Sequence, residues 1–220
     1  AIKEKVTEEG GKVVISSSIG PDDEDVTMRE VDYDQFVRPG DPDFVIHIVL
    51  DEMAHRVGEQ MKGLDSSLGD LDLIVSTGRV VDFRAKHLVR RSPSEGAVPL
   101  IYPAHFSQGF IKWPVGGLKK PDAITRERPD LLVPSGFYVL VKRFSSKEED
   151  KRIVAAVYDP SKVSSDLVGF ENHLNYYHKR GKGIPQQLAK GLAAFLNSNL
   201  VDQYFRQFSG HTQVNATDLR

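Results

Sequence analysis

Short apolar runs broken by proline and glycine fill the chain from residue 73 onward and restrict its possible folds most strongly. Such runs are too short for typical helices and are typical of short strands. The short apolar runs occur in LIVSTGRVVDF (73–83), AVPLIYP (97–103) and GFIKWPVGG (109–117). The clearest pair of strands is GFYVLVKRF (136–144) and RIVAAVYDP (152–160), joined by the wholly polar SSKEEDK. This part of the chain therefore predicts a mixed β-sheet domain with short strands.

The first 72 residues predict a small α/β connector. KVVISSS (12–18) and VTMREVDY (26–33) are predicted as strands around the acidic turn GPDDED, and DPDFVIHIVL (41–50) as a buried strand. DEMAHRVGEQMKGL (51–64) follows with the apolar spacing of a helix. The polar SSLGDLD (66–72) then predicts a boundary between a connector, 1–72, and a larger domain, 73–220.

The last predicted element is one long amphipathic helix over 184–210. Pro185 suits the first helical turn, and Gly210 suits a position just past the end. An apolar stripe at helical spacing runs between them and predicts a face packed on the core. The predicted fold class is therefore α+β, with a recognition-type mixed sheet, a long C-terminal helix and the small α/β connector in front.

The net charge of −2 hides a strong asymmetry. Residues 1–75 hold 7 Lys and Arg against 18 Asp and Glu, whereas residues 76–220 hold 22 against 13. The second part is basic enough to bind phosphate. The chain has no cysteine, which excludes disulfides and Cys-based metal sites. It has no apolar run of ~20 residues and no signal-peptide pattern at its start, so we expect a cytoplasmic protein with no membrane partner.

No catalytic constellation emerges from the motifs. GxxxxGK[ST], HExxH and GxSxG are absent, as are a nucleotide-binding glycine-rich loop and an Asn/Asp/Ser-Pro-Pro-aromatic tetrapeptide. We therefore expect no catalytic residue, metal ligand or cofactor in this chain. One nuclease-like pattern remains as a minor alternative, with Asp130, Glu149 and Lys151 as its metal-dependent site. A solvated hairpin tip explains the same charges more simply.

The basic part carries side chains suited to DNA. Arg and Lys bind phosphate or the guanine edge, and Asn and Gln pair with adenine, although each such residue taken singly is more often a solvated surface residue. The predicted phosphate or guanine contacts are Arg79, Arg84, Lys86, Arg90, Arg91, Lys119 and Lys120, with Lys112 as a further DNA contact. The predicted base readers, or alternatively loop-scaffolding residues, are His105, Gln108, Asn172, His173, Asn175, Tyr176 and Tyr177. The residues predicted to bind the DNA backbone are His178, Lys179, Arg180 and Lys182.

Several stretches also resemble a known family. The chain is similar to the C-terminal target-recognition region of bacterial restriction-modification N6-adenine DNA methyltransferases, of the Eco57I-like and BsuBI/PstI-like groups. The similarity lies in STGRVVDFR (76–84), PLIYPAHF (99–106), FYVLVKRFSSKEEDKRIVAAVY (137–158), ENHLNYYHKRGKG (171–183) and LNSNLVDQYFRQFSGHTQVNATDLR (196–220). The last stretch also resembles the recognition domains of type I specificity subunits.

The resemblance implies a division of labour. In that family a separate N-terminal domain binds S-adenosylmethionine and holds the flipped adenine, and neither part is found in this chain. Residues 73–220 would then recognise double-stranded DNA in a fragment that lacks its N-terminal catalytic domain. The alternatives are a stand-alone type I-like specificity module, the nuclease, and a protein-interaction domain whose basic face meets an acidic partner.

Overall fold

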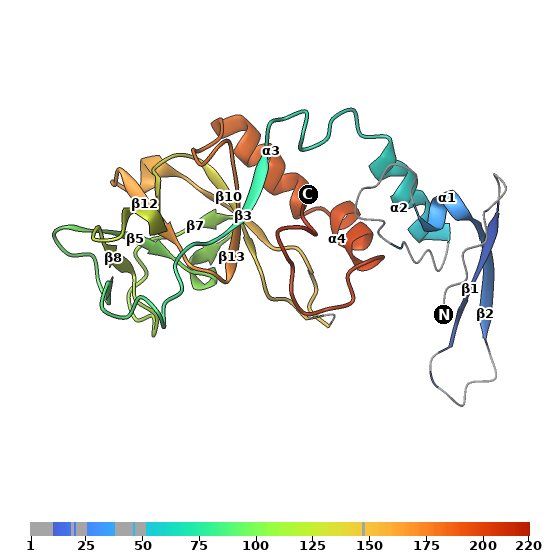
Figure 1. The fold of residues 1–220 in the computed structure, drawn as a ribbon, viewed down its shortest axis with the longest axis horizontal. Helices are drawn as coiled ribbons and strands as arrows, with labels where there is room; N and C mark the ends of the chain where they lie inside the picture. The colour runs from blue at the N-terminus through green and yellow to red at the C-terminus, as the bar shows by residue number, and fades with distance from the viewer. Residues whose placement is uncertain (1–10, 19, 21–25, 38–45, 47–51, 147) are drawn as a thin grey trace. The chain divides into compact units, whose positions relative to one another are not determined.

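A computed structural model describes residues 11–18, 20, 26–37, 46, 52–146 and 148–220 of the chain (Figure 1). The chain divides into two compact units: residues 1–64 with 203–210, and residues 65–202 with 211–220. The predicted turn GPDDED and the predicted strand over 41–50 lie outside the described residues, apart from Gly20 and Ile46. None of the described helices is long and apolar enough to cross a membrane.

The first unit contains the predicted strand pair and the predicted helix. Strands β1 (Lys12–Ser17) and β2 (Thr27–Asp32) form an antiparallel pair that runs directly into the short helix α1 (Tyr33–Phe36). Helix α2 (Glu52–Lys62) confirms the periodicity seen in 51–64. Val31 and Val57 are buried, and Gln207 donates a hydrogen bond to the Ala54 carbonyl at 2.9 Å.

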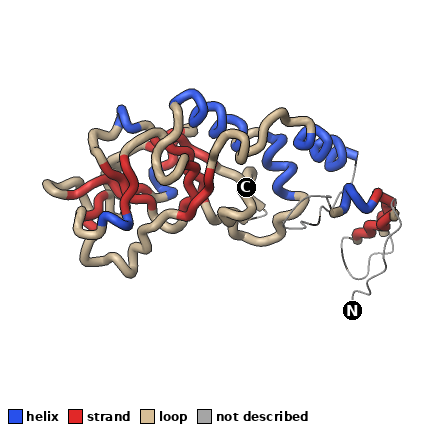
Figure 2. Tube along the Cα trace, turned by 45° about the horizontal axis from the view of Figure 1, so that its top comes forward, coloured by secondary structure: helices blue, strands red, loops and turns tan. Residues whose placement is uncertain are grey.

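The second unit is built from two sheets of short strands joined by long loops (Figure 2). One sheet has the order β3-β13-β10-β11-β7-β6, and the other has the order β4-β8-β5-β12-β9. The first sheet consists of β3 (Ile74–Thr77), β6 (Phe106–Ser107), β7 (Phe110–Ile111), β10 (Tyr138–Lys142), β11 (Ala155–Tyr158) and β13 (Leu174–His178). The second consists of β4 (Val89–Arg90), β5 (Ala97–Ile101), β8 (Ala123–Thr125), β9 (Leu132–Pro134) and β12 (Leu167–Phe170). Two of the described 3₁₀ turns, Pro103–His105 and Pro160–Lys162, lie between strands of different sheets, and a third, Pro129–Leu131, connects β8 to β9 within the second sheet.

Side chains from both sheets meet in one core. Tyr138 of β10, Phe170 of β12 and Tyr176 of β13 are fully buried and pack edge to face or tilted, with ring centroids 5.1–6.1 Å apart. On the outer side of the second sheet, Ala85 and Leu88 pack against Leu100 and Ile124 in a second apolar cluster. The α+β class predicted from the sequence, with several sheets and few helices, is confirmed.

The single long helix predicted over 184–210 is not what the structure shows. Helix α3 (Gln186–Leu196) packs on β10 and β11, and a separate helix α4 (Asn199–Arg206) follows it (Figure 1). Helix α3 ends before Asn197, because the side-chain amide of Asn197 pairs with the backbone of Ala155 on β11. The amide accepts from the Ala155 N–H at 3.0 Å and donates to the Ala155 carbonyl at 2.9 Å. The Ser198 hydroxyl then accepts from the Val201 N–H at 3.3 Å and starts α4 as an N-cap.

Candidate nucleic-acid interface

The basic segment, residues 84–91, is held by two buried apolar side chains. Ala85 and Leu88 are 5% and 2% exposed, and each closes a backbone turn, with Ala85 N–H bonded to the Val81 carbonyl and Leu88 N–H to the Ala85 carbonyl. The Thr125 N–H then ties the Leu88 carbonyl to β8 at 2.9 Å. Apolar anchors three residues apart leave the intervening charged side chains to point outward.

Four cations of the basic segment are exposed and have no carboxylate partner. Arg84, Lys86, Arg90 and Arg91 make no ion pair with any residue in the part of the chain that the structure describes. Arg90 donates to the His87 and Val89 carbonyls of its own segment, at 2.8 and 3.0 Å. Phe83, next to the segment, is 62% exposed, and the Arg84 guanidinium lies 5.5 Å from its ring centroid. Unpaired cations around an exposed ring are suited to a polyanion that carries aromatic bases.

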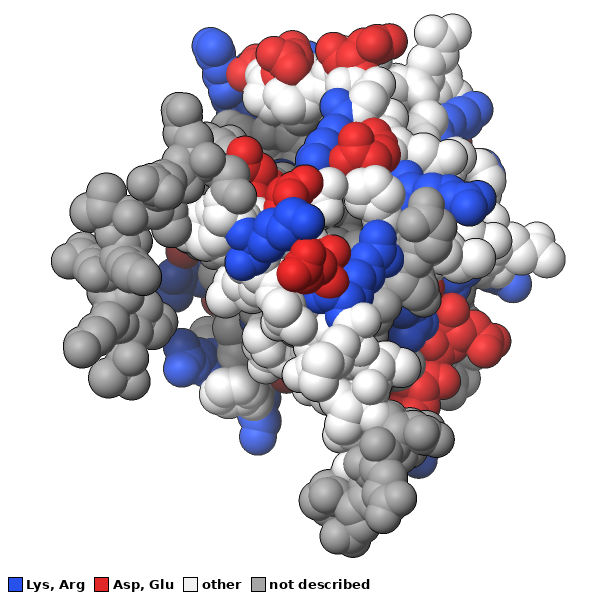
Figure 3. Space-filling view, turned by 90° about the vertical axis from the view of Figure 1, so that its right-hand side faces the viewer, with Lys and Arg blue, Asp and Glu red and all other residues white. Residues whose placement is uncertain are grey.

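Other basic side chains are neutralised locally. Arg126 and Asp166 form a two-pronged ion pair, which lowers the pKa of Asp166 to about 2. Arg128 pairs in the same way with Asp130. On the face shown in Figure 3, Lys and Arg side chains alternate with Asp and Glu, so that face is not uniformly basic. The four cations of the basic segment differ from Arg126 and Arg128, because no carboxylate among the described residues neutralises them.

The turn Glu171–Leu174 lies beside the strand that leads into the basic segment. The Val80 N–H bonds the Phe170 carbonyl at 3.0 Å, and the Asn172 N–H bonds the Val80 carbonyl at 2.9 Å. Gly78 permits this approach, because a Cβ on it would lie 2.1 Å from the Glu171 carbonyl oxygen. Two residues further on, Asp82 accepts from Lys120 at 2.8 Å, which lowers the pKa of Asp82, and the charge of His173 acts in the same direction.

This turn brings together two predicted contacts, Asn172 and His173. His173 lies at its tip with a half-exposed side chain, and its Nδ1 is 2.5 Å from the buried carboxylate of Glu171. The Phe144 ring, 43% exposed, lies 5.1 Å from the imidazole ring. Lys120, another predicted contact, bonds Asp82 at 2.8 Å, and the charge of His173 contributes to lowering the pKa of the same carboxylate.

Five predicted contacts lie inside the fold. The Asn175 amide accepts from Thr77 Oγ1 at 3.0 Å and donates to the Val214 carbonyl at 2.8 Å. Tyr176 and Tyr177 are 1% exposed. His178 lies between Ser76 Oγ, 2.9 Å from its Nε2, and the Gly181 N–H, which donates to its Nδ1 at 3.0 Å.

His105 has both ring nitrogens engaged as well. The Tyr102 N–H donates to its Nδ1, and its Nε2 lies 2.9 Å from the Asp122 carboxylate. For His105, Asn175, Tyr176 and Tyr177 the loop-scaffolding alternative agrees with the geometry, because their polar groups are turned inward. His178, which was predicted to bind the DNA backbone, is also turned inward.

The remaining predicted contacts are on the surface but not in one place. Lys179–Lys182 form a tight hairpin turn in which Arg180 and Gly181 both have positive φ, 47° and 81°. Arg180 lies 3.9 Å from Asp72. Arg79 donates to the carbonyls of Asp130 and Leu132 at 3.3 and 3.2 Å, which ties two segments of the unit together. Lys112, Lys119 and Gln108 are exposed, with Gln108 at the tip of the β6–β7 hairpin.

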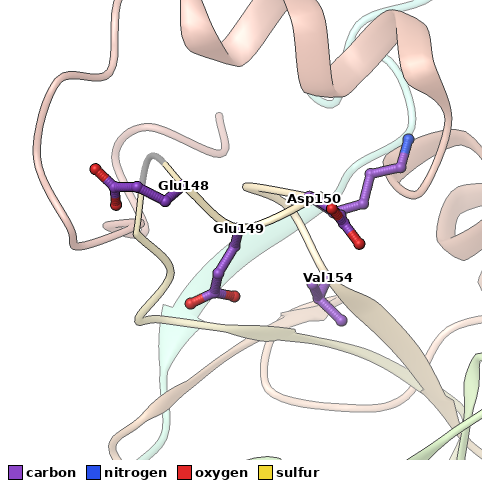
Figure 4. Close-up of a pocket in the computed structure, with 5 residues that line it drawn as sticks. Glu148, Glu149, Asp150 and Val154 are labelled. Atoms are coloured by element: carbon purple, nitrogen blue, oxygen red, sulfur yellow. The ribbon is translucent and has the colours of Figure 1, made fainter.

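The nuclease alternative finds no support in the geometry. Figure 4 shows the hollow lined by Glu148, Glu149, Asp150, Lys151 and Val154, in which the three carboxylates point in different directions. The Glu149 carboxylate accepts from the Ser146 N–H at 3.1 Å. Asp130 is held by Arg128, which lowers its pKa. Across the described residues, no three His, Asp or Glu side chains form a group suited to a metal ion.

Two parts of this surface escaped the sequence analysis. Glu171 is fully buried, and as a lone acid between an apolar run and a polar pair it carried no motif. Arg143, which follows β10, bonds the Asn172 carbonyl through its side chain and the His173 carbonyl through its backbone N–H. Only the contacts across the fold identify both residues.

Comparison with known proteins gives two similar sequences. Over 210 residues, 94% of its length, the chain is 46% identical to Type II methyltransferase M.PstI of Providencia stuartii and covers 41% of that protein. It is 47% identical over 210 residues to Type II methyltransferase M.BsuBI of Bacillus subtilis and covers 42% of it. Its relatives are type II methyltransferases. No family model and no solved structure matches the chain.

The similarity expected with BsuBI/PstI-like enzymes is confirmed. The chain spans about two fifths of the length of these curated relatives. Its assignment to their C-terminal recognition region, its target base and its DNA contacts remain predictions.

Proposed function

We propose that this chain is the target-recognition part of a site-specific N6-adenine DNA methyltransferase of a restriction-modification system. The observation that carries the proposal is the basic segment, where four exposed cations lack acidic partners among the described residues. The segment follows Val80, which bonds the turn that displays Asn172 and His173. Phosphate contacts of this kind supply affinity and register, and amide or imidazole groups supply the choice of base.

The length of the relatives supports the same division of labour. Type II methyltransferases similar to this chain are more than twice as long, so the methyl transfer is assigned to the part that the chain does not cover. S-adenosylmethionine would bind there, and none of the present residues fits that role, since no nucleotide-binding glycine-rich loop or Asn-Pro-Pro-aromatic motif occurs in the sequence. Partners of this chain would then be double-stranded DNA and a catalytic domain.

Selection from a random-sequence duplex pool tests the proposal. The 220-residue chain would be incubated with the pool at low salt and again at raised salt, and the bound duplexes sequenced. We expect one short motif to be enriched at both salt concentrations. Salt-sensitive binding without any motif, or no binding, would contradict sequence-specific recognition by this chain.

A variant of the basic segment and a control variant test whether this segment binds the DNA phosphates. Replacing Arg84, Lys86, Arg90 and Arg91 by Ala is expected to weaken duplex binding about a thousandfold and to reduce the dependence of affinity on salt. Arg126→Ala with Arg128→Ala is the control, because these exposed guanidinium groups are already neutralised by Asp166 and Asp130. An equal loss of binding free energy per removed charge in the two variants would show that only net charge matters.

A stand-alone specificity module is the second candidate. It would use the same surface without a catalytic domain in the same polypeptide. The similarity to long methyltransferases over 94% of the chain favours the first candidate. Sequencing the coding DNA upstream of Ala1 for an Asn-Pro-Pro-aromatic motif separates the two.

A further inference from the structure

The turn Glu171–Leu174 has a backbone in which every polar group of its two tip residues is bonded. The Asn172 N–H donates to Val80, and its carbonyl accepts from the Arg143 side chain at 2.7 Å. The His173 N–H donates to the Glu171 carboxylate at 2.9 Å, and its carbonyl accepts from the Arg143 N–H at 2.9 Å. Such a turn is held in one conformation by parts of both sheets.

The side chains of the same two residues are free at their polar ends. Within the described part of the chain, the Asn172 amide has no hydrogen-bond partner, and His173 is bonded only through Nδ1, which leaves Nε2 open. A fixed backbone that displays an unpaired amide and an unpaired imidazole nitrogen loses little conformational entropy on binding.

The buried side chain of Glu171 also indicates that the turn displays His173 to a ligand. Its side chain is fully buried, and within the described residues its two oxygens bond only the N–H and Nδ1 of His173. Burying a carboxylate is costly, and Val80 and Arg143 already hold the other backbone groups of the turn. The contact through Nδ1 fixes the imidazole ring so that Nε2 faces outward, as carboxylates do for histidines in metal and catalytic sites.

From these contacts we propose that the turn Glu171–Leu174 is the base-reading element of this chain, with Asn172 and His173 contacting neighbouring base edges in the major groove and Glu171 as the positioning residue. This inference rests on the proposed function. An Asn amide matches the N6 and N7 atoms of adenine as donor and acceptor. His173 Nε2 contacts the adjacent base pair, and the basic segment binds the flanking phosphates.

The closing experiment repeats the duplex selection with three single variants. Asn172→Ala and His173→Ala are each expected to lose about tenfold discrimination at one base-pair position of the motif, while the dependence of affinity on salt stays unchanged. Glu171→Gln is expected to relax the same position as His173→Ala. Gln187→Ala, an exposed amide on α3, is the control and should select the wild-type motif.

The outcomes distinguish a failure of the base-reading role of the turn from a failure of the proposed DNA recognition by the chain. A motif that survives Asn172→Ala and His173→Ala at every position overturns the reading role and leaves DNA recognition standing. Uniform weakening with a smaller salt dependence also overturns it, because that is the behaviour of phosphate contacts. A wild-type chain that enriches no motif overturns both proposals. Both Ala variants replace exposed or half-exposed side chains, so they decide the matter even if Glu171→Gln does not fold.

Discussion

Asparagine and histidine occur twice within seven residues of this chain, and the two pairs have opposite environments. Asn172 and His173 stand on a turn with polar atoms open to solvent, whereas Asn175 and His178 lie in β13 with both ends of each side chain bonded. The residue types are the same, and the sequence assigned all four to DNA. The difference shows that the type of a polar residue does not by itself indicate a ligand contact. The hydrogen bonds that its side chain makes within the fold must also be known.

The position of each pair in the sheet explains the difference. β13 is flanked by β3 and β10, and its five residues are all buried. The turn before it connects β12 of the second sheet to β13 of the first, and the side chain of His173 on it is half-exposed. Polar groups inside a sheet must be bonded by the fold, and those on a rigid turn are available to a ligand.

The largest effect is expected from Gly78→Ala, which disturbs both regions at once. Its Cβ would lie 2.1 Å from the Glu171 carbonyl oxygen and 2.7 Å from that of Phe170, and both are backbone atoms that cannot rotate away. We expect the free energy of unfolding to fall by more than about 3 kcal/mol, measured by urea denaturation. Gly191→Ala on α3, where a Cβ meets nothing within 4 Å, is the control and should be neutral or stabilising by up to about 1 kcal/mol. Equal stability of the two variants would show that the contact between the strand and the turn is not rigid.

The sequence predicted those parts of the molecule that depend on local spacing. The β1–β2 pair, helix α2, the β10–β11 pair and the mixed sheet follow from apolar periodicity and turn residues. The basic segment is also local, since its anchors Ala85 and Leu88 are three residues apart among charged neighbours.

The parts that were not predicted depend on distant partners. Asn175 forms a hydrogen bond with Thr77, 98 residues away in the sequence. Asn197, which follows the end of α3, forms one with Ala155, 42 residues away. Glu171 and His173 are only two residues apart, but the turn that brings them into contact is held by Val80 and Arg143, which are distant in the sequence. No pattern in one sequence shows such bonds in advance.

A second prediction compares the two asparagines directly. Asn175→Ala leaves the Val214 carbonyl and the Thr77 hydroxyl without their partner inside the fold, so we expect unfolding to become easier by about 2 kcal/mol. Asn172→Ala removes a half-exposed amide that bonds nothing in the described chain, and should change stability by less than about 0.5 kcal/mol. Urea denaturation of both variants at one pH gives the answer. If Asn172→Ala were the more damaging, the distinction between the turn and the strand would be wrong.

The smallest effect is expected from His178, through pH. Burial lowers the pKa of His178, and the positive charge of Arg79 acts in the same direction. The structure gives a reason, because Nδ1 accepts from the Gly181 N–H and cannot take a proton without losing that bond. The unfolded chain therefore binds this proton first as the pH falls below the ordinary value of 6.5, and the free energy of unfolding falls with it until the folded pKa is passed.

His178→Gln removes that proton and isolates its effect. The stability advantage of the wild type over the variant should be full above pH 7 and should shrink as the pH falls through 6.5 toward 5, as measured by urea denaturation at steps of pH. An advantage that stays constant, or grows in acid, would mean that His178 takes a proton at least as readily in the folded chain as in the unfolded one. In that case the bonds that His178 makes within the fold would not hinder its protonation, and β13 would no longer contrast with the turn that precedes it.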